Sequence, residues 1–210
     1  MKRIVKLLFI AGFALSTFGI IRIGYFEAKA ELAQHLMETA WQENKRLVNQ
    51  FGGKLNQRIK QAEQNIKPWP WADTWPVLKL MIPSVDFNYL VLKDASGESL
   101  AFGPGLLTNA VYPGEPGNSF IVAHRDTHFK NLGSVKKDAL IEIEDRNENV
   151  IRFKIDQIKI VDSRIERPIT DSADVRVTLV TCYPFNAIQS NTPYRYLVSG
   201  KLVPEEVLNS

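Results

Sequence analysis

The second half of the chain is a series of short apolar runs separated by polar turns, and this pattern limits the fold to a mainly β architecture. The clearest pair alternates apolar and charged side chains over residues 140–144 and 150–155, which predicts a half-exposed hairpin. A second hairpin is predicted where residues 89–93 and 99–102 flank Asp94-Ala95-Ser96-Gly97. Further strands are predicted for residues 119–123, 157–161, 176–181 and 194–203. This number of strands favours a closed or nearly closed, antiparallel-rich β-barrel.

The chain as a whole suits one domain with an appendage, because 210 residues with 45% hydrophobic side chains build a core of ordinary size. We divide it into a signal anchor or transmembrane segment at residues 1–30, a helical spacer with a Pro- and Trp-rich connection at 31–77, and the β-barrel domain at 78–210. Five basic residues precede position 30, so the remainder has no basic excess and a nucleic-acid partner is not expected. Neither zinc-ligand spacing nor a glycine-rich phosphate loop occurs, so no metal and no cofactor is predicted.

The N-terminus has the pattern of a membrane anchor. Three basic residues within the first six precede a charge-free apolar run at residues 7–21. Counted from residue 4 to residue 26, the run reaches the roughly 20 residues that a membrane helix requires. Ala28-Lys29-Ala30 also fits a signal-peptidase site, so cleavage after Ala30 is the alternative to a retained anchor. In both cases we expect the rest of the chain on the exported side of the plasma (inner) membrane, periplasmic or extracellular.

The spacer is predicted to be helical. Apolar positions recur at helical spacing from Glu31 to Phe51, which predicts a stalk or packing helix that ends at Gly52-Gly53. A weaker run at residues 55–66 predicts a second helix, which stops before Pro68. Prolines and tryptophans share residues 68–76 and exclude a regular helix there, so these tryptophans are expected to cap the domain or to lie near the membrane surface.

Cys182 is the only cysteine, so it forms no internal disulfide and is either a small buried apolar residue or a nucleophile. It ends a strand-like run at residues 177–182 that turns at Pro184, and His124 follows the run 119–123 in the same way. Only a thiolate attacks, and a nucleophilic thiol needs a neighbour that takes or balances its proton. Because the ends of two strands can meet in space, His124 is the candidate partner of Cys182.

Three segments resemble the histidine, cysteine and arginine motifs of the sortases, a family of membrane-anchored cysteine transpeptidases. They are Val122-Ala123-His124-Arg125-Asp126-Thr127, Thr178-Leu179-Val180-Thr181-Cys182, and Arg195 within residues 193–198, and they occur in the family's order. The resemblance covers roughly residues 78–203 and implies a sortase-like closed β-barrel. The tryptophan-rich segment and residues 28–36 are similar to the Gram-negative branch of the family, class GN.

The resemblance implies a role for each motif residue. Cys182 would be the nucleophile that forms a thioester. His124 would protonate the departing amine and later deprotonate the incoming one, since imidazole titrates nearest to working pH. Arg195 would bind the tetrahedral oxyanion or the peptide carbonyl through its fixed N–H groups.

Neighbouring residues are open to two interpretations each. Thr181 either supplies a hydroxyl donor or packs as a β-branched strand residue. Asp126 is either a turn residue, paired locally with Arg125, or the third member of a Cys-His-Asp arrangement. His128 lies where the resembling family usually has an aromatic side chain, so we interpret it as a wall or surface residue.

The activity implied by the resemblance is that of a cysteine (thiol) protease-like transpeptidase, a hydrolase in class. It would cut a C-terminal LPxTG-like sorting motif of an exported protein and pass the acyl group to an amine of a cell-wall precursor or a protein, or to water. Two alternatives remain. An L,D-transpeptidase also uses an exported cysteine, but Val180-Thr181 replace its usual Ser-x-Gly approach. A non-catalytic membrane-anchored binding module would use Cys182 for packing alone.

Overall fold

The computed structural model describes residues 31–48, 65–166, 172–187 and 192–204, together with four single positions before residue 30. The chain divides into two compact units, Met1–Leu36 and Met37–Ser210. None of the helices in the described ranges has the length and apolar content needed to cross a bilayer. The predicted anchor at residues 1–30 and the predicted helix at 55–66 lie, apart from those single positions and the last two residues, outside the described residues.

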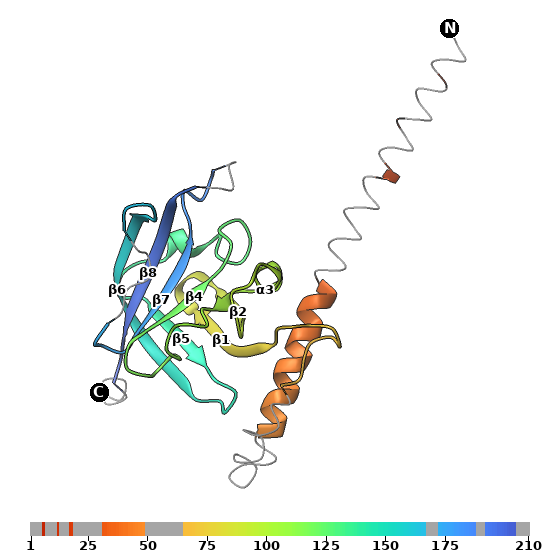
Figure 1. Ribbon diagram of the computed structural model, residues 1–210, viewed down its shortest axis with the longest axis horizontal. Coiled ribbons are helices and arrows are strands. Elements are labelled where there is room, and N and C mark those ends of the chain that lie inside the picture. The colour runs from red at the N-terminus through yellow and green to blue at the C-terminus, as the bar shows by residue number, and fades with distance from the viewer. Residues whose placement is uncertain are drawn as a thin grey trace. The chain divides into compact units, whose positions relative to one another are not determined.

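The second unit is built around a closed eight-stranded barrel with the strand order β1-β2-β3-β4-β7-β8-β6-β5 (Figure 1). The strands are β1 (Pro76–Ile82), β2 (Phe87–Leu92), β3 (Gly105–Leu106), β4 (Asn118–Val122), β5 (Leu140–Glu144), β6 (Val150–Asp162), β7 (Arg176–Cys182) and β8 (Tyr194–Leu202). The short helices are η1 (Pro83–Val85), α3 (Gly97–Phe102) and η2 (Leu132–Ser134). Most neighbouring strands are antiparallel, whereas β2 with β3 and β4 with β7 are parallel. The predicted mainly β, closed barrel is confirmed.

The charged and apolar alternation at residues 140–155 gives the predicted hairpin, with β5 and β6 paired in register. The second of these strands is longer than predicted. Residues 150–155 and 157–161 belong to the one strand β6, whose pairing with β8 shifts register between Ile155 and Gln157. Such an irregularity breaks the two-residue alternation of side chains, which is why the sequence pattern suggested two strands.

The predicted hairpin at residues 89–102 is wrong in its second half, because residues 97–102 form helix α3. Ser96 is the N-cap and its hydroxyl accepts from the backbone N–H of Ser99 at 3.2 Å. Asp94 accepts from the Ser96 N–H at 2.9 Å and from the Ser99 hydroxyl at 2.7 Å. Asp, Ser and Gly mark turns and helix N-caps alike, and here the capping hydrogen bonds decide for the helix.

Alternate side chains of the strands point inward and form the barrel core, in which Phe153, Ile121 and Leu80 are fully buried. Residues 31–48 are helical, as predicted, and the predicted helix end at residue 51 lies outside the described residues. Met37 and Trp41 of this helix form a second apolar cluster with strand β2, whose members are Met37, Trp41, Leu90 and Leu92, with Trp69 and Phe102 packed against it. Burial of one large side chain contributes roughly 1.5–3 kcal/mol, so Met37 and Trp41 attach the helical residues from Met37 onward to the second unit.

The tryptophans of residues 68–76 follow the capping prediction in two of three cases. Trp69 packs edge-on against Phe102 with ring centroids 4.8 Å apart, and Trp75 packs against the barrel core. Trp71 is 78% exposed. Residues 68–75 form neither helix nor strand, as the prolines predict, whereas residues 65 and 66, the end of the predicted second helix, are not helical.

Candidate active site

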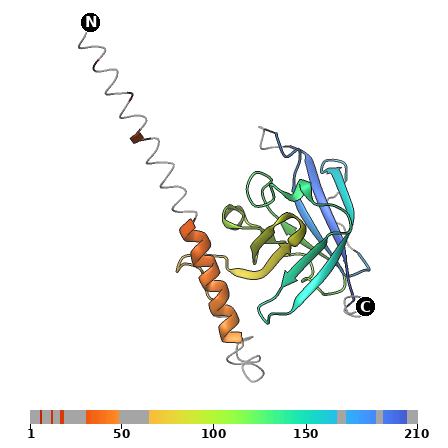
Figure 2. The same cartoon turned by 180° about the vertical axis from the view of Figure 1, so that it is seen from behind.

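Cys182 is the last residue of β7, and its side chain is half-buried. Its register partner on the antiparallel neighbour β8 is Arg195. Residues directly opposite each other in an antiparallel pair project to the same face of the sheet, about 4.5–5.5 Å apart at Cβ. The thiol and the guanidinium predicted from separate motifs therefore start from neighbouring positions on one face of the barrel. Figure 2 shows β7 and β8 side by side from the opposite direction.

His124 reaches the same end of the barrel by another strand. Strand β4 runs parallel to β7 with Val122 opposite Val180, and the Ala123 N–H donates to the Val180 carbonyl at 3.2 Å. The hydroxyl of Thr181 donates to the Ala123 carbonyl at 2.7 Å, in a buried position. His124 follows at once and is exposed. The two predicted strand ends therefore lie side by side.

The hydroxyl of Thr181 has a structural role, because it donates its proton to the carbonyl of Ala123, the residue before His124. A hydrogen bond of this kind stabilises by about 0.5–1.5 kcal/mol. Thr181 thereby fixes the segment that leads from β4 to His124 against β7, which ends at Cys182. Asp126 lies exposed in the turn that follows β4.

Two further contacts join the segment after His124 to the segment after Cys182. Arg125 is 6% exposed, and its Nη2 donates to the Ala187 carbonyl at 3.0 Å. Gly133 of η2 lies against the ring of Phe185, so close that a Cβ at this position would be 2.8 Å from Cε2. A side chain larger than hydrogen would push the ring away. The sequence suggested only a local pairing of Arg125 with Asp126. Its burial next to His124 and its bond to Ala187 indicate that it holds the two segments together.

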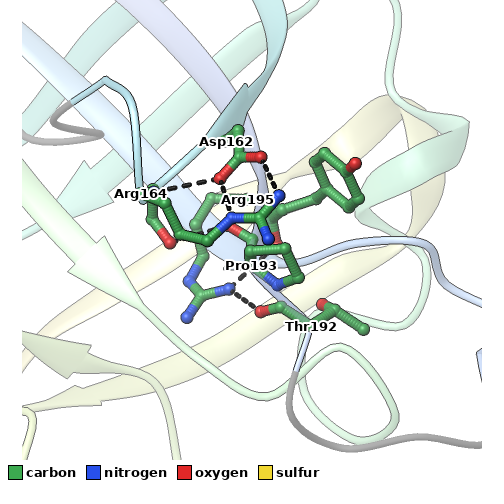
Figure 3. A network of polar contacts seen from close by, with 7 residues as sticks. Asp162, Arg164, Thr192, Pro193 and Arg195 are labelled. Carbon is green, nitrogen blue, oxygen red and sulfur yellow. Dashed lines mark hydrogen bonds and ion pairs between the residues drawn. The ribbon is translucent and has the colours of Figure 1, made fainter.

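Arg195 is held by its own loop. Its Nη1 donates to the carbonyls of Thr192 at 2.6 Å and Tyr194 at 3.0 Å (Figure 3). Thr192 in turn donates from its hydroxyl to the carbonyl of Tyr183, the residue after Cys182, at 2.5 Å. A guanidinium has five N–H groups, so those on Nε and Nη2 are additional to the ones on Nη1. The arginine is thus tied to the segment that follows the thiol.

The end of β6 supports the same loop from the other side. Ser163 donates from its N–H and its hydroxyl to the Pro193 carbonyl, at 2.9 and 2.7 Å. Arg164 donates from Nε and Nη2 to the two carboxylate oxygens of Asp162 (Figure 3). These hydrogen bonds lower the pKa of Asp162, which therefore stays ionised at neutral pH.

His128 lies in the same turn as His124 but in a different environment. It is half-buried, and its ring stands edge-on to Tyr89 of β2 with centroids 5.6 Å apart. The Nδ1 atom lies 3.2 Å from the Thr127 hydroxyl oxygen. Burial lowers the pKa of His128, and the neighbouring His124 lowers it further. The interpretation of His128 as a wall residue agrees with this packing.

In the part of the chain that the structure describes, no group of three or more His, Cys, Asp or Glu residues could hold a metal ion. The thiol is on β7, the guanidinium is on the adjoining β8, and the imidazole follows the end of the adjoining β4. These groups are suited to acyl transfer through a thioester.

A closed barrel that brings a cysteine, a histidine and an arginine to the ends of adjoining strands is typical of a cysteine-dependent acyl-transfer enzyme. Comparison with known families identifies the family. The family model described as the Sortase domain matches residues 80–203, more than half of the chain. The chain belongs to the sortase family.

Individual relatives agree with this assignment. The chain is 32% identical over 126 residues to Sortase D of Bacillus subtilis and 29% identical over 133 residues to Sortase A of Listeria monocytogenes. These matches cover 59% and 61% of this chain, and 62% and 57% of the two relatives, so the chain spans less than two thirds of either. Among solved structures, a Clostridium perfringens Sortase D5 transpeptidase aligns over 81% of this chain and 99% of that chain, with a TM-score of 0.61 at 18% identity. That likeness concerns the fold.

Proposed function

We propose that the chain is a cysteine transpeptidase of the sortase type, which cleaves a sorting motif similar to LPxTG near the C-terminus of an exported protein. The observation that carries the proposal is the register pair of Cys182 and Arg195, with His124 two residues after β4, the strand next to β7. Membership of the sortase family and these three residue types at adjoining strands support it together. An L,D-transpeptidase and a binding module that uses Cys182 for packing alone are both less favoured, because neither accounts for the family match.

In the proposed reaction the Cys182 thiolate attacks the carbonyl carbon of the scissile peptide bond. The resulting oxyanion accepts hydrogen bonds from Arg195, and collapse of the tetrahedral intermediate gives an acyl thioester on Cys182. His124 protonates the departing amine and then takes a proton from the incoming nucleophile. That nucleophile is an amine of a cell-wall precursor or of a second protein, or water, which would make the reaction a hydrolysis.

The setting of the reaction is also a proposal. An anchor within residues 1–30 would hold the enzyme at the plasma (inner) membrane as a single-pass protein, with the barrel on the periplasmic or extracellular side. The basic start and the apolar run at residues 7–21 support this orientation. The assignment to the Gram-negative branch, class GN, rests on residues 28–36 and the tryptophan-rich segment and stays a prediction.

Mass spectrometry of the full-length protein in detergent, mixed with a panel of sorting-motif peptides, tests the function. An acyl adduct on Cys182, absent in Cys182→Ala, is expected for at least one peptide, and its mass identifies the cleaved bond. Release of the adduct by an added amine distinguishes transpeptidation from hydrolysis. If no peptide acylates Cys182 and the thiol also resists alkylation near neutral pH, the result favours the alternative that the protein is a non-catalytic binding module.

A further inference from the structure

Thr192 joins two parts of the candidate site through two different atoms. Its hydroxyl donates to the carbonyl of Tyr183, the residue after Cys182, at 2.5 Å. Its own carbonyl accepts from Nη1 of Arg195 at 2.6 Å (Figure 3). Thr192 is 9% exposed, so water competes little for either bond. One residue therefore links the segment that follows the thiol to the guanidinium that lies opposite the thiol in register.

The backbone that receives the guanidinium is hydrogen-bonded at each of its carbonyls, those of residues 192–194. The Pro193 carbonyl accepts from the N–H and the hydroxyl of Ser163, directly after β6. The Tyr194 carbonyl accepts from the N–H of Tyr183 at 3.0 Å and from the guanidinium at 3.0 Å. Peptide groups bonded from several sides do not rotate freely, so the acceptors for the guanidinium are already oriented.

Arg195 uses one end of its guanidinium for this contact. Nη1 donates to the carbonyls of both Thr192 and Tyr194, whereas the N–H groups of Nε and Nη2 take no part in these bonds. Because the guanidinium is planar, two bonds to one nitrogen also fix the plane in which the other N–H groups lie. Those groups have the fixed geometry that recognition of a substrate oxygen requires.

The acceptors that hold Arg195 are carbonyl oxygens, which carry no net charge. The carboxylate at the end of β6 belongs to Asp162, next to Val161, the register partner of Arg195. Both of its oxygens accept from Arg164 (Figure 3). A carboxylate bonded to Arg195 would offset its positive charge and weaken its attraction for an oxyanion. Carbonyl acceptors orient the guanidinium and leave its charge for the substrate.

We propose that Thr192 is a positioning residue for Arg195: its hydroxyl, bonded to the segment after Cys182, fixes the carbonyl that orients the guanidinium toward the substrate oxygen. The inference rests on the proposed function, in which Arg195 binds the oxyanion. Thr192 acts through the arginine and not on the reacting atoms. A displacement of about 1 Å can cost up to about a hundredfold in rate, so loss of one hydroxyl should slow acylation while every reacting group is still present.

Alkylation of Cys182 by an anionic and a neutral reagent tests the position of the guanidinium without any substrate. The rate with iodoacetate is divided by the rate with iodoacetamide in the full-length protein in detergent. Both reagents attack the same thiolate, so the ratio reports the positive charge beside it. At low salt Arg195→Ala should lower this ratio by about threefold, and Thr192→Val by about twofold.

Thr192→Ser keeps the hydroxyl and should restore the wild-type ratio. An unaltered ratio in Thr192→Val overturns the proposal, and so does an unaltered ratio in Arg195→Ala, because the guanidinium would then not face the thiol. A serine variant as low as the valine variant contradicts a role of the hydroxyl. If valine prevents folding, Thr192→Ala, which also lacks the hydroxyl, takes its place.

Thr178→Val is the matched control. The Thr178 hydroxyl is buried on β7 and lies 3.0 Å from Oδ1 of Asn118 and 2.9 Å from the Ser199 hydroxyl, so its loss also removes hydrogen bonds from the interior. It should destabilise the fold without altering the alkylation ratio. Circular dichroism and thermal melts show whether each variant is folded.

A double-mutant cycle in single-turnover acylation tests the catalytic consequence. Thr192→Val should lower the rate by about tenfold in the wild-type background and by less than about twofold in the Arg195→Ala background, where there is no guanidinium to orient. Thr178→Val should have the same effect in both backgrounds. Equal effects of Thr192→Val in the two backgrounds would show a merely structural role and overturn the proposal. If no peptide acylates the wild type, the proposed function fails, and the alkylation ratio alone decides whether Thr192 positions the guanidinium.

Discussion

The guanidinium of Arg125 donates to the backbone carbonyl of Ala187 at 3.0 Å and so joins the turn that begins at His124 to the segment that follows Cys182. These two segments are far apart in the sequence and follow β4 and β7, respectively. Because Arg125 is buried, its loss would leave the Ala187 carbonyl without this donor. We therefore regard Arg125 as a clamp between the two halves of the candidate site.

Replacing Arg125 with Met tests this clamp. The unmet carbonyl should lower the free energy of unfolding by about 1–3 kcal/mol, and a looser site should also lower kcat more than it raises KM. Chemical denaturation and steady-state kinetics measure the two effects. Arg46→Met is the matched control, because Arg46 is 68% exposed and forms an ion pair with Glu43 on the helix surface, so both quantities should be nearly unaltered. Equal effects of the two substitutions would contradict the clamp.

Cys182→Ala should abolish acylation and leave the fold intact. The thiol is half-buried at a strand end, so its loss removes little packing, and Tm should stay within about 2 °C of the wild type. Peptide cleavage followed by chromatography, together with calorimetry, checks both statements. More than a trace of cleavage in this variant would show that another residue is the nucleophile.

The two histidines should differ in their effect on turnover. His124→Ala should reduce it by about a hundred to ten thousand fold, because an unassisted amine is a poor leaving group. His128→Ala should be much milder, since we interpret His128 as a wall residue. Cleavage rates of both variants at pH 7 give the comparison. The reverse ranking would mean that the histidine motif has been aligned wrongly at this turn.

The role of the planar guanidinium of Arg195, whose N–H groups form a fixed fork, is tested by substitution with Lys, which keeps the charge but not the planar geometry. Arg195→Ala should lower the single-turnover acylation rate by about two to three powers of ten, and Arg195→Lys should recover only a minor part of this loss. Lys has three N–H groups on one nitrogen, so bonds to Thr192 and Tyr194 like those of Nη1 would leave it one, whereas Arg195 keeps three more on Nε and Nη2. Near-wild-type rates in the lysine variant would reject the fork, and near-wild-type rates in the alanine variant would remove Arg195 from the site.

Asp145 should make stability depend on pH in the acid range. Burial opposes its ionisation, but hydrogen bonds from Asn149 and Asn147 outweigh burial and lower its pKa. A depressed pKa in the folded state stabilises above the unfolded value of about 3.9, and this stabilisation is lost as pH falls through the folded value. Asp145→Asn should thus lower Tm by a few degrees at pH 7. The difference should shrink below about pH 4 in thermal melts, and a pH-independent difference would contradict this assignment.

The sequence was sufficient where a strand had an uninterrupted apolar run. The runs ending at His124 and Cys182 predicted strand ends, and the structure places them on the parallel neighbours β4 and β7. The sequence was insufficient at residues 97–102, which form a helix, because the turn-forming residues before them include its N-cap. The partners of Arg125 and Thr181 could not be predicted either, because Ala187 and Ala123 become their neighbours only once distant strands are paired.

The parallel pairing of β4 with β7 also determines when the candidate site comes into being during folding. No contiguous fragment of the chain holds both strands without the hairpin of β5 and β6 between them. Closing so long a loop costs entropy before its contacts compensate, so such non-local pairings form slowly. An immature chain would therefore carry Cys182 as an ordinary thiol. Its chemistry would be acquired only when the barrel closes.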